Sequence, residues 1–373
     1  MIFTAYTAAA DPATQWRADL LEYSWRRLRQ PGALIRLAPM RPGRHAPAHV
    51  AARVVETLPW NPHPYTEDGY AGYELPAAAL EWLFRERVDG TVLLLGPHSI
   101  LQHTITEEAT PGRVVAAPWP DMPTGDGPLG LPEEFKFLEC YCVNRQLPLA
   151  SVQPPLLIHT SDLRKIAARW LELTSIIRAE GKGPHGKLRD ADRVAYVIAA
   201  AENRLLHGLA EIATGTEGES SKAPILDYTR SVESPRGDIV WNQDVYHPWD
   251  TVYPEKARPG AGRDFLALLN ELVTRRTSGA DLGVVRPQRR PGVREARLLE
   301  DVQLEIPGCV ELVTLNDSAA AIWELCDGKR TLAEIVGELQ QRFDAPRETL
   351  AAAVESTAKE LDSAGALELE DLL

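Results

Sequence analysis

Apolar positions recur with two spacings along residues 1–278, and the two spacings alternate. Short β-rich runs predict strands, and apolar residues three or four positions apart predict helices with one buried face. The expected strands are residues 2–6, 34–37, 52–57, 91–95 and 156–159, and the expected helices are residues 16–28, 77–84, 133–144, 161–179 and 192–209. The run TVLLL at 91–95 is typical of a parallel strand that is buried on both faces. Alternating strands and helices predict an α/β layer fold.

Residues 292–373 follow a different order, with two strands before three short helices. Apolar and polar residues alternate over 302–306, Pro307-Gly308 predicts a tight turn, and 309–315 predicts a second strand. The helices are expected over residues 319–326, onward from the capping box of Thr331 and Glu334, and over residues 346–364. Strands followed by three helices in so short a segment predict a small winged-helix α+β domain.

Negative charge is concentrated in the same C-terminal segment. Of the net charge of −13 on 373 residues, residues 295–373 contribute −12, from 18 Asp and Glu against 6 Lys and Arg. The other residues sum to −1, so a domain boundary near residue 290 follows. Residues 279–291 lack a periodic apolar pattern and predict a linker between domains at 1–278 and 292–373. Because the acidic segment repels a phosphate backbone, we expect no nucleic-acid partner.

The chain lacks the patterns of membrane and secretory segments. No apolar run reaches the roughly 20 residues that a membrane-spanning helix needs. The first residues, MIFTAYTAAADPATQW, have neither the basic start nor the long apolar core of a signal peptide. We therefore expect a cytoplasmic location and no membrane partner.

The C-terminal segment contains the run LNDSAAAIWELCDG at 315–328, followed by TLAEI at 331–335. With these motifs, residues 292–370 resemble PqqD-like domains, the RiPP recognition elements that bind the leader of a ribosomal precursor peptide. In that family the leader adds a strand to the edge of the small sheet, and main-chain hydrogen bonds supply the affinity. The resemblance implies a peptide-binding edge at Cys309, Val310, Glu311, Leu312 and Val313 and a groove lined by Leu350 and Val354. Leu350 and Val354 equally fit a plain core.

In the N-terminal domain, chemistry is expected at the end of the buried strand. Ligands of open α/β sheets bind outside the carboxyl ends of strands, and GPH at 96–98 occupies that position. The surrounding motifs are PWNPHPYTEDGYAGY at 59–73, IAARWLELT at 166–174 and YHPWD at 246–250. This combination resembles the hydroxyproline arabinosyltransferase and peptidyl-serine galactosyltransferase family over most of residues 1–275. The resemblance implies a GT-A-like fold and transfer of a sugar from a nucleotide diphosphate sugar to a hydroxyl.

One position departs from that family. Its usual Asp-Pro-Asp, whose carboxylates hold a divalent metal against the donor diphosphate, is replaced by Gly96-Pro97-His98. Hard ions such as Mg²⁺ prefer oxygen ligands, so the replacement weakens such a site. Three outcomes stay open. His98, with His247, binds a softer ion such as Mn²⁺; Arg or Lys neutralises the diphosphate without metal; or sugar transfer has been lost.

Further site residues follow from the same resemblance and from local chemistry. The residues expected to bind the nucleotide sugar are Tyr6, Gln15, His63, Asp68 and Tyr70. Asp250 is the expected base for the acceptor hydroxyl, and His98 and His247 are the other candidate catalytic residues. His63, in a Pro-rich loop, and Gln15, beside Trp16, also fit packing roles.

These features predict a peptide-modifying enzyme of a RiPP pathway. The C-terminal domain would bind the leader, and the N-terminal domain would transfer a sugar to a hydroxyl of the same peptide. The alternative is a catalytically degenerate glycosyltransferase-like scaffold that presents the bound precursor to another enzyme of the pathway. A third interpretation keeps the pocket but uses a donor that is not a sugar.

Overall fold

The structure is a computed structural model of the chain. It describes residues 1–9, 12–40, 52–142, 149–183, 186–209, 212–216, 223–229, 231–247, 250–278, 285–298, 301–307 and 312–371. The chain divides into two compact units, the first made of most of residues 1–266 and the second made mainly of residues 267–373. The division falls within helix α5 (Ala261–Ser278).

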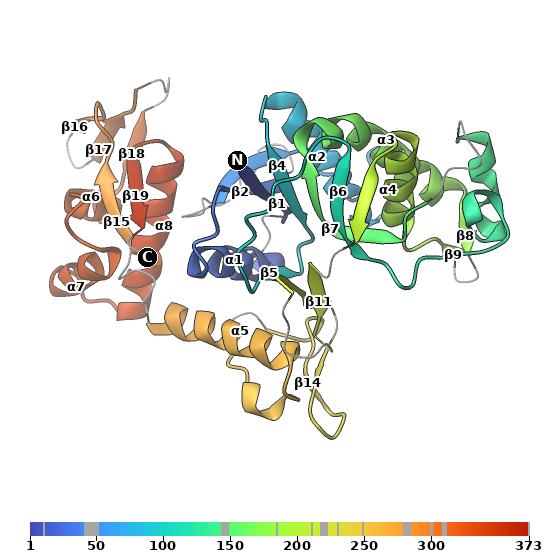
Figure 1. Cartoon of the computed structure of the whole chain (residues 1–373). Coiled ribbons are helices and arrows are strands. Elements are labelled where there is room, and N and C mark those ends of the chain that lie inside the picture. Colours follow the sequence, from blue (N-terminus) through green and yellow to red (C-terminus); the bar gives the residue numbers. More distant parts are fainter. Residues whose placement is uncertain are drawn as a thin grey trace. The chain divides into compact units, whose positions relative to one another are not determined.

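A seven-stranded mixed sheet forms the centre of the first unit (Figure 1), in the order β10-β6-β7-β4-β1-β2-β3. Its strands are β1 (Ile2–Thr7), β2 (Ala33–Pro39), β3 (Ala52–Thr57), β4 (Thr91–Leu95), β6 (Arg113–Pro118), β7 (Val152–His159) and β10 (Leu206–Leu209). β1 is parallel to both β2 and β4, whereas β7 is antiparallel to β4 and β6. Strands β1 and β4 therefore end at the same edge of the sheet.

Both faces of this sheet are covered, which explains the continuous apolar run of β4. Val92 and Leu94 pack in one cluster with helices α2 (Glu74–Arg85), α3 (Thr160–Glu180) and α4 (Ala191–Glu202). Leu93 and Leu95 pack in a second cluster with helix α1 (Pro12–Arg27). Successive side chains of a strand point to opposite faces, so a strand between two helical layers is apolar at every position. The α/β layer fold predicted for this region is confirmed.

The remaining elements of the first unit are short. They are β5 (Ser99–Leu101), β8 (Lys182–Gly183), β9 (Gly186–Lys187), β11 (Ala213–Gly215), β12 (Ile225–Asp227), β13 (Val232–Glu233), β14 (Ile239–Trp241) and the 3₁₀ helices η1 (Ala71–Tyr73), η2 (Pro128–Gly130), η3 (Glu133–Cys140) and η4 (Pro254–Lys256). β12 lies between β11 and β5 in a three-stranded sheet. β5 begins one residue after His98, so this small sheet holds the loop that follows β4.

Two helix predictions differ from the structure. The helix expected over 133–144 is a 3₁₀ helix over 133–140, and residues 143–148 lie outside the described residues. The helix expected over 192–209 ends at Glu202, because Arg204 adopts a left-handed backbone conformation with φ of 57°. The residues that follow pair with β6 as β10, so the sheet takes up apolar residues that continued the helical pattern.

The second unit contains two small sheets and three helices. Its strands are β15 (Val285–Arg289), β16 (Arg294–Leu298), β17 (Asp301–Glu305), β18 (Val313–Leu315) and β19 (Leu367–Asp371), and its helices are α6 (Asp317–Leu325), α7 (Leu332–Arg342) and α8 (Arg347–Ser363). Strands β16, β17 and β18 form an antiparallel sheet in that order, and β15 pairs with β19. The Asn316 side chain caps α6, and Thr331 with Glu334 forms the predicted capping box of α7.

The segment expected as a linker contains a strand. Residues 285–289 form β15, antiparallel to β19, and Val285 is buried in the core of the second unit. A strand with only one buried face has few apolar residues. The sequence V-R-P-Q-R of β15 therefore did not predict a strand. Strand β16 was also not predicted, because three of its five residues, R-E-A-R-L, are charged.

Candidate functional site

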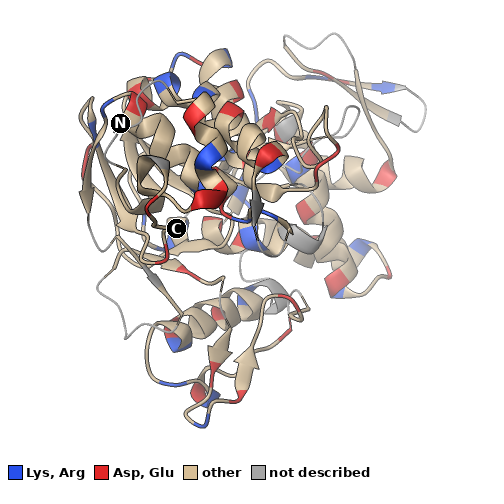
Figure 2. Cartoon of the chain, turned by 90° about the vertical axis from the view of Figure 1, so that its right-hand side faces the viewer, with Lys and Arg blue, Asp and Glu red and all other residues tan. Residues whose placement is uncertain are grey.

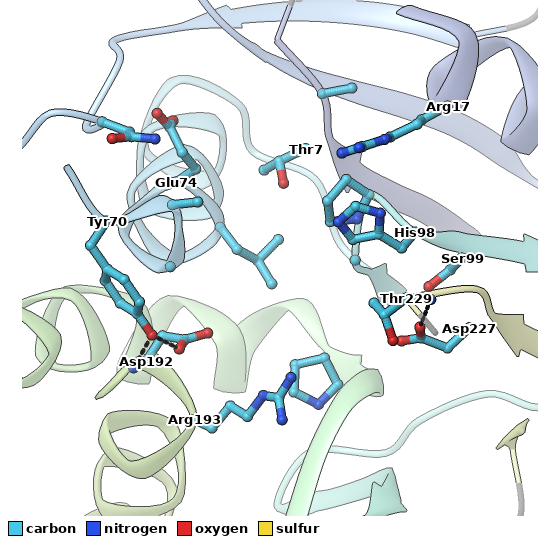
Figure 3. Close-up of a pocket in the computed structure, with 18 of the residues that line it drawn as sticks. Thr7, Arg17, Tyr70, Glu74, His98, Ser99, Asp192, Arg193, Asp227 and Thr229 are labelled. Carbon is cyan, nitrogen blue, oxygen red and sulfur yellow. Dashed lines mark hydrogen bonds between the residues drawn. The ribbon is translucent and has the colours of Figure 1, made fainter. Parts of the chain in front are cut away.

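A cavity of about 550 Å³ lies at the edge of the sheet where β1 and β4 end. Its walls come from the residues after these two strands, the starts of α2 and α4, and the turn after β12 (Figure 3). Its charged lining residues are Arg17, Glu74, Arg189, Asp190, Asp192, Arg193 and Asp227. This is the edge at which open α/β sheets bind ligands, as the sequence predicted.

His98 lines the cavity from the loop between β4 and β5. Its ring meets the Tyr228 ring edge-on at a centroid distance of 5.9 Å, and its carbonyl oxygen accepts a hydrogen bond from the Tyr228 amide at 2.9 Å. His98 Nδ1 is buried and has no hydrogen-bond partner among the described residues. Burial, together with the positive charge of Arg17, lowers the pKa of His98 to about 4. The imidazole is therefore neutral at pH 7, with one ring nitrogen able to donate and the other able to accept.

Arg17 extends from α1 toward His98 (Figure 3). The Arg17 Nε atom is buried and has no hydrogen-bond partner in the described part of the chain. Its guanidinium carbon lies 5.5 Å from the centroid of the Trp16 ring. The aromatic face supports the cation from one side, which leaves the hydrogen-bonding edge available to a ligand. The cavity thus has a cation beside the loop Gly96-Pro97-His98 at the end of β4.

A carboxylic acid lies in another wall of the cavity, at the first position of α2. Backbone amides of Trp60 and Asn61 donate to the Glu74 carboxylate, whereas Glu74 Oε2 is buried without a partner among the described residues. Burial raises the pKa of Glu74 to about 7. This side chain can therefore hold or release a proton near neutral pH.

Tyr70 is the one predicted donor-binding residue that lines the cavity. Its hydroxyl hydrogen-bonds to the Asp192 carboxylate and lies 2.5 Å from the Arg189 carbonyl oxygen. Burial raises the pKa of Asp192, and burial with the nearby Asp192 charge raises that of Tyr70. The Arg178 guanidinium stacks 4.3 Å from the Tyr70 ring centroid. These contacts join the loop before α2 to the start of α4.

Asp68 and His63 do not line the cavity and are held by contacts within the first unit. Asp68 is buried and pairs with Arg178 at 2.8 Å and with Lys187 at 2.9 Å. The hydrogen bond from Arg178 is the largest effect that lowers the pKa of Asp68. His63 Nδ1 accepts the Tyr65 amide at 3.2 Å, its Nε2 lies 3.2 Å from the Ser175 hydroxyl, and burial lowers its pKa. These bonds fit the packing role that the sequence left open for His63.

Tyr6 and Gln15 also lie outside the cavity lining. Tyr6 is buried in the cluster under α1. Gln15 accepts a hydrogen bond from Arg36 at 3.1 Å and donates one to Asp19 at 2.8 Å. The predicted donor-binding role of both residues therefore has no support from the geometry of the cavity.

The residues at the strand end do not fit a hard divalent cation such as Mg²⁺. Gly96 offers no side-chain ligand, and His98 offers a nitrogen in place of the carboxylate oxygens that hard ions prefer. Within the ranges that the structure describes, no three His, Cys, Asp or Glu side chains form a group suited to a metal. His247 is exposed and does not line the cavity. Metal binding by His98 and His247 stays a prediction.

Asp250, the predicted base, is exposed and belongs to the second unit. It is not among the residues that line the cavity, whereas Trp249 beside it lies outside the described residues. The catalytic roles of Asp250 and His247 stay predictions.

The predicted peptide-binding edge is described in part. Cys309, Val310 and Glu311 lie outside the described residues. Val313 begins β18, which is the last strand of its sheet and pairs with β17 alone among the described strands. Leu312, directly before β18, is 55% exposed.

Leu350 and Val354, the predicted groove residues, are buried in the core of the second unit. Val354 is completely inaccessible and Leu350 is 9% exposed. Both pack with residues of α6 and α7 in one cluster. This burial agrees with the core role that the sequence left open, and peptide binding by these two residues stays a prediction.

Arg17 and Glu74 were not predicted from the sequence. Both are charged residues on amphipathic helices, and such residues normally face solvent. The place of Arg17 in the sequence was the available signal. Arg17 directly follows Trp16, which the family resemblance included, and α1 directly follows β1. Only the fold shows that these helices bring the two side chains to one cavity.

Comparisons with known proteins support both resemblances. Residues 308–367 match the family of coenzyme PQQ synthesis protein D (PqqD). Over 222 residues, 56% of this chain, the sequence is 26% identical to a peptidyl serine alpha-galactosyltransferase of Arabidopsis thaliana. Over 34 residues, 9% of this chain, it is 50% identical to the PqqA binding protein of Methylococcus capsulatus. The matches span 27% and 37% of the lengths of these two relatives.

A solved structure is similar to a large part of the chain. The galactosyltransferase LgtC, in complex with donor and acceptor sugar analogs, matches over 73% of this chain and 96% of its own length, with 10% sequence identity and a TM-score of 0.39. The two regions thus have separate relatives: a glycosyltransferase for the first unit and PqqD for the second.

Proposed function

We propose that this chain is a leader-directed peptide glycosyltransferase. The second unit binds the leader of a ribosomal precursor peptide, and the first unit transfers a sugar from a nucleotide diphosphate sugar to a hydroxyl of that peptide. The observation that carries the proposal is the presence, in one chain, of a PqqD match and a match to an enzyme that modifies peptidyl serine.

The edge of the small sheet supports peptide binding. Because β18 is a terminal strand, its outer edge presents backbone N–H and C=O groups to an incoming strand. The exposed Leu312 beside it offers an apolar contact for a leader side chain. A relative that is 50% identical over 34 residues is named the PqqA binding protein, so its name describes a binding function.

The cavity of the first unit supports group transfer. It lies at the carboxyl ends of β1 and β4, and it combines cations, an acid whose pKa is about 7 and hydrogen-bonding groups. In the proposed reaction the peptide hydroxyl oxygen bonds to the anomeric carbon of the sugar. The bond from that carbon to the diphosphate breaks with its electron pair on the diphosphate, and the hydroxyl proton leaves to a base or to water.

Acidic and basic residues occur side by side along the same helices (Figure 2). The described helices include none that is long and apolar enough to cross a membrane.

The connection of the two units in one chain also fits this division of roles. Binding of the leader by a unit of the same chain makes the encounter with the cavity intramolecular. A short flexible connection gives an effective concentration in the millimolar range.

Transfer is tested by incubating the full chain with the precursor peptide encoded beside it and a panel of nucleotide sugars. We expect the mass of the peptide to rise by one sugar residue with one donor, and the leaderless core peptide to react at least about tenfold more slowly. If no donor gives a product in the presence of EDTA, Mg²⁺ or Mn²⁺, the transferase proposal is wrong.

Leader binding is tested at the sheet edge. Leu312→Asp places a charge in the expected contact and should weaken leader binding at least about tenfold, as loss of a central apolar contact does. Phe343→Asp is the matched control, because Phe343 is an exposed apolar residue of the same unit, at 37%, after the end of α7. Fluorescence anisotropy with a labelled leader peptide measures both. Equal affinity of the two variants would contradict binding at this edge.

The absence of carboxylates at the strand end favours a second candidate, a scaffold that presents the precursor to another enzyme. Such a scaffold would bind the leader with the same dependence on Leu312 but bind no nucleoside diphosphate. Calorimetry with uridine and guanosine diphosphates separates the two functions.

A further inference from the structure

Each of two residues that line the cavity has a buried side-chain nitrogen atom without a hydrogen-bond partner. These atoms are Arg17 Nε and His98 Nδ1, and both observations hold for the described part of the chain. A buried polar group without a hydrogen-bond partner is unfavourable, and more so when it is charged. Two such groups in one cavity wall indicate a ligand that satisfies both.

The two groups are close enough to act together. The charge of Arg17 contributes to the lowered pKa of His98, and Figure 3 shows the Arg17 side chain extending toward the His98 ring. Within the described residues, no carboxylate pairs with Arg17, whereas Arg193 on another wall pairs with Asp190 at 3.6 Å. Arg17 is thus a cation of the cavity with unused hydrogen-bonding capacity.

The chemistry of these groups selects an anion with several oxygen atoms. A guanidinium remains charged at any physiological pH, and its planar donors match the oxygen atoms of a phosphate. A neutral imidazole adds one donor without adding charge. Gly96 and His98 bring no carboxylate of their own to this strand end, and the nearest acidic lining residue is Asp227, whose strand pairs with Ser99.

We infer that Arg17 and His98 form the binding site for the diphosphate of the donor, and that this site holds the diphosphate without a divalent metal ion. The inference rests on the proposed function, and it adds the residues and the cation. Arg17 supplies the positive charge that a metal supplies in enzymes with carboxylates at this position. His98 donates a hydrogen bond to the same group.

Calorimetry on the full chain tests the site with uridine diphosphate and with inorganic pyrophosphate as probes. We expect the same dissociation constant, within about twofold, in EDTA and in Mn²⁺. Arg17→Ala should weaken binding at least about tenfold, since it removes a charge-assisted hydrogen bond. Arg17→Lys should have an intermediate effect, because lysine keeps the charge but loses the planar fork.

Matched variants separate binding from folding. Arg27→Ala removes an exposed arginine at the other end of α1 that does not line the cavity, and it should bind as the unchanged protein does. His98→Ala should weaken binding several-fold, whereas His98→Asn should restore most of it because the amide nitrogen replaces the ring donor. Thermal unfolding of every variant confirms that it is folded during the measurement.

The outcomes distinguish this inference from the proposed function. Binding in EDTA that depends on Arg17 supports the inference. Sugar transfer or nucleotide binding that requires Mn²⁺ and is unchanged in Arg17→Ala overturns the inference and leaves the proposed function intact. If neither probe binds under any condition and no sugar is transferred, both are wrong.

Discussion

The candidate functional surfaces of the two units differ in how far apart their residues lie along the chain. In the second unit the expected contact surface is one stretch of chain, Leu312 and the strand β18 that follows it. In the first unit the cavity collects side chains from α1, α2, α4 and two loops, and residues as distant as Arg17 and Thr229 line it. A recognition edge can therefore be located from a contiguous motif, whereas a cavity requires the fold.

The two units also differ in the kind of buried group that bears on function. In the second unit the buried residues Leu350 and Val354 belong to the apolar core. In the first unit the buried atoms of interest are polar, namely Arg17 Nε, Glu74 Oε2 and His98 Nδ1. Apolar burial stabilises a fold, whereas a buried polar atom without a partner costs free energy, which a ligand can offset where the residue lines a cavity.

The strongest test of this comparison is to unfold one unit and measure the other. Trp323 is 2% exposed, its indole nitrogen donates to Glu295 at 3.1 Å, and the Arg289 guanidinium stacks 4.7 Å from its ring centroid. Trp323→Ala should destabilise the second unit by about 3–5 kcal/mol, the usual cost of such a truncation in a core. Leader binding should be lost, while binding of uridine diphosphate should not change. Loss of both activities would show that the units do not act separately.

A smaller effect is expected at Asp68, where the sequence predicted a donor contact. Asp68→Asn removes the charge that pairs with Arg178 and Lys187 and should destabilise the first unit by about 3 kcal/mol, typical of a broken buried pair. Because pairing lowers the pKa of Asp68, its stabilisation is present at neutral pH and is lost as pH falls through the folded-state pKa. Urea unfolding at pH 7 and pH 3 measures this loss.

The nucleotide affinity of the same variant decides the role of Asp68. Within the folded protein we expect the dissociation constant for uridine diphosphate to stay within about twofold, because Asp68 does not line the cavity. A tenfold weakening would instead restore the donor-binding role that the sequence predicted.

The smallest effect is expected at Glu74. Burial raises its pKa to about 7, so the wild-type chain loses stability as pH rises from about 4.5 through 7, where this buried group must ionise. Glu74→Gln cannot ionise and should be more stable than the wild type by about 2 kcal/mol at pH 8, with the difference absent at pH 5. Urea unfolding at both pH values provides the test. The same difference at both pH values would place the effect in packing and not in the proton.

The element pattern of both units was largely predictable from the sequence. Strands β1, β3 and β4 and the capping box of α7 lie where local periodicity placed them. The errors concern residues whose local pattern is weak. Strand β15 has only two buried positions, too few to show a pattern of alternation. The apolar residues of β10 continue the helical spacing of α4 beyond the turn at Arg204, so they were assigned to the helix.

The candidate site was predictable in position but not in composition. The strand-end rule led to Gly96 and His98, and Tyr70 was also found in advance. Arg17 and Glu74 were not, because a charged residue on a helix carries no sign of its burial. His63 and Asp68 were expected at the cavity because they sit in a motif with Tyr70, but their side chains turn to Ser175 and Arg178.

By itself, the sequence determined the two-part organisation, most of the strands and helices and the edge of the sheet at which the cavity forms. These depend on periodicity, capping and charge, which act between residues close along the chain. Only the tertiary structure decided which polar groups share the cavity and which of them lack partners. Those properties depend on how helices and loops distant in sequence pack on the same sheet edge, and on the solvent that this packing excludes.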